Sequence, residues 1–187
     1  MKNISRNAFV SRFEENKLYD CTYYHNPNRW NEIPSTLFSS MLKEEHWSRL
    51  IKYLDKDNND ISPEINSIPD NKGGVYIFFI VGPTLPFIER YIAYIGRAQS
   101  TPYQNIRKRV KEYLRESNKV NGRHKIVELF KHWKDYLYLM YFECEDNERI
   151  VQLEGYLIHS ILPPFNDDIP YKIEIKTPQK AFSLQHA

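Results

Sequence analysis

The chain has 187 residues, of which 41% are hydrophobic and 27% charged, and its formal net charge is +2. This composition is ordinary for a soluble globular protein of one domain, and no apolar run approaches the roughly 18–20 residues of a membrane span. The N-terminus lacks the apolar core of a signal peptide, so we expect a cytoplasmic protein. The two cysteines, Cys21 and Cys144, lie far apart in sequence and indicate neither a zinc site nor a disulfide framework.

The first 72 residues predict a helical and irregular N-terminal extension. Segment 19–34 is rich in aromatic and turn-forming residues, which is typical of irregular structure. Apolar residues at steps of three and four then predict a helix over 35–54. The run 55–72 contains many Asn, Asp and Pro residues and predicts a loop.

A β-hairpin is predicted next. The stretches G-G-V-Y-I-F-F-I-V (73–81) and R-Y-I-A-Y-I-G-R (90–97) are apolar, β-branched and aromatic, as buried strands are. The glycine and prolines of 82–86 predict a loop between them. A tyrosine lies within each strand, Tyr76 and Tyr94, which fits either a packed core or the floor of an active site.

The rest of the chain predicts two helices, a strand and a third helix, and then a short terminal strand. Their expected ranges are 104–117, 125–133, 136–144, 146–162 and 171–176. We therefore expect an α+β fold with a small, mainly antiparallel three-stranded sheet flanked by helices. The expected domains are an extension (1–72), a central domain (73–167) and a C-terminal tail (168–187).

Basic residues are concentrated between positions 104 and 125, where only Glu112 and Glu116 oppose them. Such a cluster is usually a solvated helix face, but one this one-sided also favours a partner that carries phosphates. Apart from Arg109, the candidate DNA-binding residues are Arg107, Lys108, Lys111, Arg115, Lys119, Arg123 and Lys125.

Three residues of the predicted helices and their ends do not fit a plain core. Glu154 falls within the apolar arc of helix 146–162, so its carboxylate must be paired, protonated or bound to metal; a structural salt bridge is the alternative. Arg109 lies at the edge of an apolar stripe and either points into a cleft, where it could hold a phosphate, or lies on the surface. Asn166 follows two prolines and is either functional or a turn former.

Together these positions resemble the GIY-YIG nuclease superfamily over residues 73–167. The two motifs are matched by Gly74-Val75-Tyr76 and Tyr94-Ile95-Gly96. Arg109 matches the arginine of the following helix, Glu154 the metal-binding glutamate and Asn166 the later asparagine. Tyr113 stands where the family often has a histidine, and this tyrosine and the long insert between the motifs resemble the type II restriction endonuclease branch.

The resemblance implies a GIY-YIG fold and hydrolysis of a DNA phosphodiester with one divalent metal ion, Mg²⁺ or Mn²⁺, held by Glu154. Tyr76 would be the general base, with Arg97 or another cation favouring its phenolate. Arg109 would neutralise the phosphoryl oxygens, and both phenols and Glu154 would lie over one face of the hairpin. The remaining roles are a hydrogen bond to water or phosphate from Tyr94, a hydrogen bond to phosphate or base from Tyr113, and orientation of the carboxylate or the substrate by Asn166.

Double-strand cleavage by a restriction-type enzyme needs two such sites, so we expect a homodimer on double-stranded DNA, with residues 1–72 contacting DNA or the second subunit. Two alternatives stay open. One is a repair or branched-DNA nuclease with the same catalytic residues. The other, from a different class, is a nucleic-acid-binding module without activity.

Overall fold

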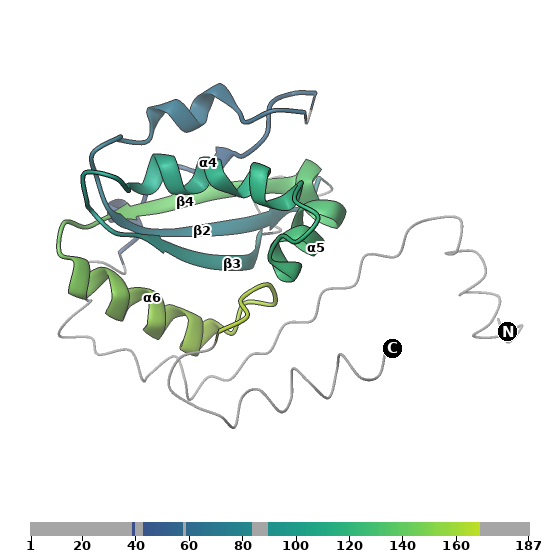
Figure 1. The fold of residues 1–187 in the computed structure, drawn as a ribbon. Coiled ribbons are helices and arrows are strands. Elements are labelled where there is room, and N and C mark those ends of the chain that lie inside the picture. Colours follow the sequence, from purple (N-terminus) through teal and green to yellow (C-terminus); the bar gives the residue numbers. More distant parts are fainter. Residues whose placement is uncertain (1–38, 40–42, 58, 84–89, 169–187) are drawn as a thin grey trace, which may run out of the picture.

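The computed structural model describes residue 39 and residues 43–57, 59–83 and 90–168 (Figure 1). They form an α+β fold with one four-stranded antiparallel sheet in the order β1-β4-β2-β3. The strands are β1 (Ile51–Lys52), β2 (Gly74–Val81), β3 (Arg90–Ala98) and β4 (Leu137–Glu143), and the α-helices are α4 (Ile106–Ser117), α5 (His124–Trp133) and α6 (Asn147–Ile161). Three short 3₁₀ helices, η1 (Glu44–His46), η2 (Pro63–Ser67) and η3 (Lys134–Tyr136), complete the described elements.

The helices cover both faces of the sheet: α4 and α5 lie on one face, and α6 lies on the other (Figure 1). Alternation along β2 produces the two cores. Tyr76 and Phe78 pack under α4 and α5, whereas Val75 and Ile77 pack against α6. Because α4 and α5 cover one face of the sheet and α6 the other, the side chains of β2 are buried on both faces, which is why its sequence is a nearly continuous apolar run.

Two glycines are required where β2 and β3 pair. Gly74 has φ +151°, and a Cβ there would lie 1.9 Å from the backbone oxygen of Phe142. Gly96 pairs with Tyr76, whose ring packs directly over it. A Cβ on Gly96 would lie 2.6 Å from the Tyr76 hydroxyl oxygen, so the second motif needs glycine to accommodate the tyrosine of the first.

The strands and helices expected after residue 72 are confirmed with small shifts of their ends, except the terminal strand 171–176, which lies outside the described residues. The expected three-stranded sheet is wrong, because β1 adds a fourth strand beside β4. The expected helix over 35–54 is wrong where the structure describes it. There, backbone groups bond to the edge of β4, from Ser48 N to Tyr141 O (2.8 Å) and from Tyr53 N to Leu137 O (3.0 Å), and these bonds replace helical ones.

The segment before the hairpin is part of the same packing unit. Tyr53, Ile65 and Ile68 are fully buried in the core under α4, and the Tyr53 hydroxyl donates to the Val110 carbonyl oxygen of α4 at 2.7 Å. The expected irregular segment 19–34 lies outside the described residues. In the part of the chain that the structure describes, no helix has the length and apolar character to cross a membrane.

Helix α6 begins and ends where the sequence indicates. The side chain of Asp146 caps it by accepting from the amides of Glu148 (3.0 Å) and Arg149 (3.2 Å). At the other end, Leu162 adopts a left-handed conformation with φ 54° just before Pro163. The chain therefore turns away from the helix axis, and residues 165–166 then run along the outer edge of β3.

Candidate active site

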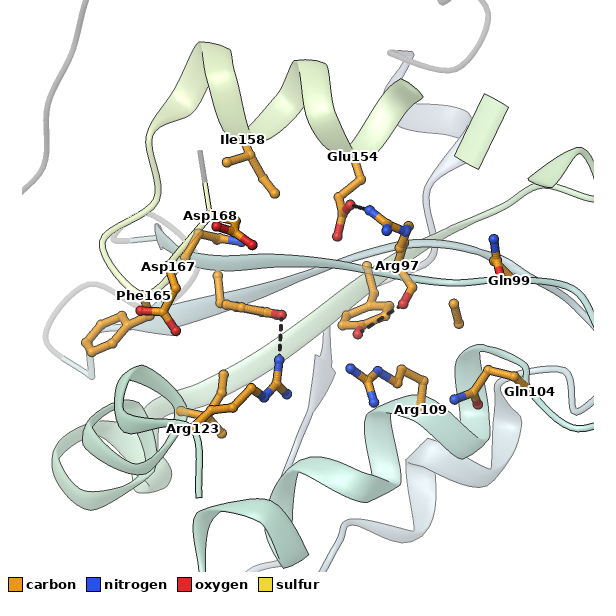
Figure 2. Close-up of a pocket in the computed structure, with 15 residues that line it drawn as sticks. Arg97, Gln99, Gln104, Arg109, Arg123, Glu154, Ile158, Phe165, Asp167 and Asp168 are labelled. Atoms are coloured by element: carbon orange, nitrogen blue, oxygen red, sulfur yellow. Dashed lines mark hydrogen bonds and ion pairs between the residues drawn. The ribbon is translucent and has the colours of Figure 1, made fainter. Parts of the chain in front are cut away.

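A pocket of about 730 Å³ lies at the free edge of β3, between α4 and α6 (Figure 2). Tyr76 and Tyr94 reach it from the face covered by α4, whereas Arg97 and Glu154 reach it from the α6 side. The expectation that Tyr76 and Glu154 lie over one face of the hairpin is therefore wrong. They meet at the edge because no strand among the described residues pairs with the outer side of β3, and side chains from both faces can turn into the same space. The other lining residues are Ala98, Gln99, Gln104, Arg109, Arg123, Ile126, Ile158, Phe165, Asn166, Asp167 and Asp168.

Three tyrosines form a connected hydrogen-bonded cluster at the base of this pocket. The Tyr76 and Tyr113 hydroxyls lie 2.6 Å apart, and the Tyr113 hydroxyl donates to the Tyr94 hydroxyl oxygen at 3.1 Å. Tyr76 is 0% exposed and Tyr94 is 9% exposed, so Tyr94 is the member of this pair that reaches solvent. Its oxygen also accepts from Arg123 Nη1 at 3.5 Å, which leaves the Tyr94 proton available to a ligand in the pocket.

Burial keeps Tyr76 and Tyr94 protonated. Loss of solvation raises the pKa of Tyr76 well above the ordinary value of about 10, and the neighbouring phenols raise it further; Arg109 opposes this rise only in part. The pKa of Tyr94 is also raised, first by burial and then by Tyr113. The environment thus favours a neutral Tyr76 phenol and not the phenolate expected from the sequence. The cation that lowers the pKa of Tyr76 is Arg109, which is within the expectation of Arg97 or another cation.

Two arginines flank the tyrosine cluster on the α4 side. Arg109 comes from the first half of α4 and pairs with Glu112 at 2.7 Å. Its guanidinium carbon lies 5.6 Å from the centre of the Tyr113 ring, one helical turn further on. Of the two alternatives for Arg109, a cleft or the surface, the structure favours the first, since Arg109 lines the pocket with a third of its side chain exposed. Arg123, just before α5, lies over the same ring at 5.2 Å.

Glu154 of α6 forms an ion pair with Arg97 of β3 across the mouth of the pocket (Figure 2). The Glu154 side chain is 13% exposed, so a bare carboxylate there would be costly. The sequence predicted that this carboxylate is paired, protonated or bound to metal, and in the structure it is paired with Arg97. Both residues keep contact with the pocket, so the pair lies within reach of a ligand as well as stabilising the packing of α6 against β3.

Asn166 is bonded to the edge of β3 with both ends of its side-chain amide. Its Oδ1 accepts from Ile95 N at 2.9 Å, and its Nδ2 donates to Ile95 O at 2.7 Å. The side chain thus makes the two hydrogen bonds that a neighbouring strand would make with Ile95. Asn166 is 4% exposed, and both polar groups of its side chain bond to the backbone of Ile95. The structure therefore gives it a role in positioning β3, in place of the expected contact with the carboxylate or the substrate.

The residues expected to bind DNA do not form one free surface. Arg123 belongs to the pocket, and Lys108 and Arg115 are exposed on α4. The other four bond to nearby groups: Arg107 to Ile68 O and Asp70, Lys111 to Asn66, Lys119 to Glu116, and Lys125 to Pro164 O. Much of this basic segment is therefore already used to join α4 and α5 to the rest of the fold.

Sequence reasoning missed four polar residues that line the pocket. Gln99 and Gln104 lie in the link between β3 and α4, and Asp167 and Asp168 directly follow Asn166. Their proximity to the second motif and to Asn166 is the signal that could have identified them. Because they come from connections and not from periodic elements, no hydrophobic pattern shows which way their side chains point.

The pocket has one carboxylate, Glu154, at the position where the resemblance implies a metal ion. Among the described residues, no three or more His, Cys, Asp or Glu side chains are grouped so that they could hold a metal ion. Mg²⁺ commonly keeps several waters and uses one or two carboxylates together with substrate phosphates, so Glu154 alone is compatible with such a site. Arg97 already pairs with that carboxylate, and a metal ion would have to share or replace this contact.

Comparisons with protein-family models, with curated proteins and with solved structures find no match to this chain.

Proposed function

We propose that this protein is a divalent-metal-dependent endonuclease of the GIY-YIG type that hydrolyses phosphodiester bonds in DNA. One observation carries the proposal: Tyr76, Tyr94, Arg109 and Glu154 line a single pocket although they come from β2, β3, α4 and α6. Their positions match landmarks of a nuclease sequence pattern, and a chance match in sequence would not require these side chains to converge. Tyr113 bonds to both motif tyrosines, and Asn166 holds the strand that carries Tyr94.

The pocket offers hydrogen-bond donors to a phosphodiester on its α4 side. Arg109 presents a guanidinium, whose planar fork suits two phosphate oxygens. The Tyr94 hydroxyl accepts from Tyr113 and from Arg123, so it can give its own proton to a substrate oxygen. Donors held in place before the substrate arrives stabilise negative charge as it develops, without reorganising at the moment of reaction.

Tyr76 acts in this proposal as a neutral positioning residue. Its raised pKa makes it a poor base in the free protein. Through its 2.6 Å contact with Tyr113 it fixes the direction in which the cluster presents its hydrogen bonds to the pocket. Glu154 is the residue that would hold Mg²⁺ or Mn²⁺, and the ion, when bound, would supply Lewis-acid stabilisation of the phosphoryl oxygens.

The proposed substrate is double-stranded DNA, cut in the manner of a restriction enzyme. One hydrolytic site cuts one strand, so two chains acting together on a near-palindromic sequence would cut both. A repair or branched-DNA nuclease could use the same pocket. Sequencing the fragment ends separates the two, because recurrent ends indicate a fixed recognition sequence and scattered ends indicate recognition of DNA structure.

A second candidate function is nucleic-acid binding without cleavage. It is favoured by the Arg97–Glu154 ion pair, which occupies the carboxylate that a metal needs, and by the complete burial of Tyr76. This candidate requires the protein to bind DNA in the presence of Mg²⁺ and leave it intact.

The test is cleavage of supercoiled plasmid and phage DNA in Mg²⁺ by the wild type, Arg109→Ala and Glu154→Ala. We expect the two variants to lose about 10²-fold or more in rate, which is typical for removal of a group that stabilises transition-state charge. Arg49→Ala is the matched control, since Arg49 is an exposed arginine paired with Glu64 near the β1 side of the sheet. Full activity in Glu154→Ala would contradict the proposal, and DNA that is bound but intact would favour the second candidate.

A further inference from the structure

We infer that Arg123 is a second phosphate-binding residue of this pocket, which together with Arg109 holds the substrate phosphodiester. The inference rests on the proposed function and names a residue outside the motif positions that the sequence matched. In the sequence, Arg123 is one of eight basic residues between 104 and 125 and has no feature that separates it from the others. Its position in the fold does separate it.

Arg109 and Arg123 converge on one tyrosine from two different elements. Their guanidinium carbons lie 5.6 Å and 5.2 Å from the centre of the Tyr113 ring. In Figure 2 the two guanidinium groups point toward each other on the α4 side of the pocket, opposite the Arg97–Glu154 pair. Both arginines line this one pocket, so the proposal places the substrate phosphodiester between their guanidinium groups.

The position of Arg123 is fixed by α4 and does not depend on a flexible side chain alone. Its backbone amide donates to Glu116 Oε1 at 3.1 Å, and its Nε lies 3.9 Å from the same oxygen. Glu116 lies one turn beyond Glu112, the partner of Arg109. Helix α4 therefore holds both arginines through two of its glutamates and carries Tyr113 between them.

The contacts of Arg123 leave its guanidinium available to a ligand. The separation of 3.9 Å from Glu116 is too long for a hydrogen bond. The hydrogen bond to the Tyr94 hydroxyl uses Nη1 at 3.5 Å, close to the limit for such a bond. The side chain is 40% exposed and lines the pocket, so a phosphate oxygen can reach the remaining N–H groups.

The competing explanation is structural: Arg123 could serve only to pack over Tyr113 and tie α5 to α4. Such a role predicts a loss of stability when Arg123 is replaced and no change in phosphate affinity of the folded protein. Asp167 and Asp168 line the same pocket, so the positive charge of Arg123 is also opposed by carboxylates. Affinity for a single phosphodiester distinguishes these roles, because it depends on the guanidinium itself.

The experiment measures binding of the dinucleotide thymidylyl thymidine, which has one phosphodiester, by NMR titration at fixed ionic strength with Ca²⁺ in place of Mg²⁺. The variants are Arg123→Met, which keeps the apolar stem, and Arg123→Lys, which keeps the charge and loses the planar fork. Arg49→Met is the control. Thermal melting of each variant is recorded alongside.

We expect Arg123→Met to bind the dinucleotide about tenfold more weakly, which is the loss of one hydrogen bond to a charged group. Arg123→Lys should fall between Arg123→Met and the wild type, and Arg49→Met should bind as the wild type does. For duplex DNA, the slope of log affinity against log salt should drop by about one in Arg123→Met. These results would support Arg123 as a phosphate-binding residue.

Wild-type affinity in a folded Arg123→Met variant would overturn the inference, whatever its melting temperature. If Arg123→Met does not fold, wild-type affinity in Arg123→Lys overturns it. Failure of the proposed function gives a different pattern. If the wild type cuts no DNA but Arg123→Met lowers dinucleotide affinity, the nuclease is refuted and the binding site is supported. If the wild type cuts DNA and Arg123→Met has wild-type dinucleotide affinity, only the role of Arg123 is refuted.

Discussion

Replacing Asn166 with alanine removes the side chain that substitutes for a neighbouring strand at the edge of β3. The Ile95 amide and carbonyl, bonded to Asn166 at 2.9 Å and 2.7 Å, would both lose their partner. Ile95 is fully buried and Asn166 is 4% exposed, so water reaches these groups poorly.

The size of the effect follows from the two buried groups that are left unpaired. An unsatisfied buried donor or acceptor costs about 1–3 kcal/mol, so the substitution should lower the free energy of unfolding by about 2–5 kcal/mol. That is a large part of the roughly 5–15 kcal/mol by which a typical domain is stable. With a urea dependence of about 1–3 kcal/mol per molar, the urea midpoint should fall by about 1–2 M.

Asn147→Ala is a closely matched control. Asn147 also uses both ends of its amide on the backbone of a single residue, accepting from Ser100 N at 2.8 Å and donating to Ser100 O at 3.3 Å. This site is only partly buried, so water can replace the lost bonds, and we expect a cost of at most about 1 kcal/mol. Both variants are compared with the wild type by urea unfolding, followed by circular dichroism.

DNA cleavage by Asn166→Ala should fall with the folded fraction, and the folded molecules should keep cleavage to the extent that β3 keeps Tyr94 in place, because Asn166 uses its amide on the β3 backbone. A variant with wild-type stability and abolished cleavage would refute this reasoning and would show that the Asn166 amide acts on the substrate. A variant with wild-type stability and wild-type cleavage would refute the claim that the two hydrogen bonds matter for β3.

Two further predictions concern the tyrosines. Burial raises the folded-state pKa of Tyr53, Tyr76 and Tyr94 above the ordinary value near 10. Their contribution to stability is therefore complete below about pH 10 and is lost as the pH rises above it, by up to about 1.4 kcal/mol per pH unit for each tyrosine. Phenolate absorbance and unfolding should appear together, and ionisation of all three tyrosines near pH 10 in the folded protein would contradict this. Gly96→Ala would place a Cβ 2.6 Å from the Tyr76 hydroxyl oxygen. Displacement of the Tyr76 ring should lower the free energy of unfolding by about 1–3 kcal/mol and reduce cleavage per folded molecule. Unchanged melting and cleavage would show that Tyr76 need not pack over residue 96.

The elements that the sequence predicted correctly are those with long periodic patterns. Strands β2 and β4 are apolar runs because helices cover both faces of the sheet. Helix α6 combines an apolar arc with a cap at Asp146 and an end just before Pro163. Strand β1 could not be predicted in this way. It has two residues, and backbone bonds to β4 create it, so its own sequence carries no strand pattern.

The sequence predicted which residues form the candidate site better than it predicted how they are arranged. Tyr76, Arg109 and Glu154, which the pattern singled out, line one pocket in the structure, although Tyr76 and Glu154 reach it from opposite faces of the sheet. The sequence could not show that the pocket lies at the edge of β3, because this depends on which strand is outermost in the sheet. It likewise could not show that Asn166 would bond to β3, or that the turn before α5 would bring Arg123 over Tyr113.

The most direct test of the central claim compares plasmid cleavage by the wild type and Glu154→Gln in Mg²⁺ and in EDTA. Glutamine keeps the size of the side chain and removes the charge that a metal ion and Arg97 both need. We expect the wild type to cut in Mg²⁺ and to stop in EDTA, and the folded variant to cut at least about 10²-fold more slowly while still binding DNA. Equal cleavage by the two proteins, or wild-type cleavage that persists in EDTA, would contradict a metal-dependent phosphodiester hydrolysis site at this pocket.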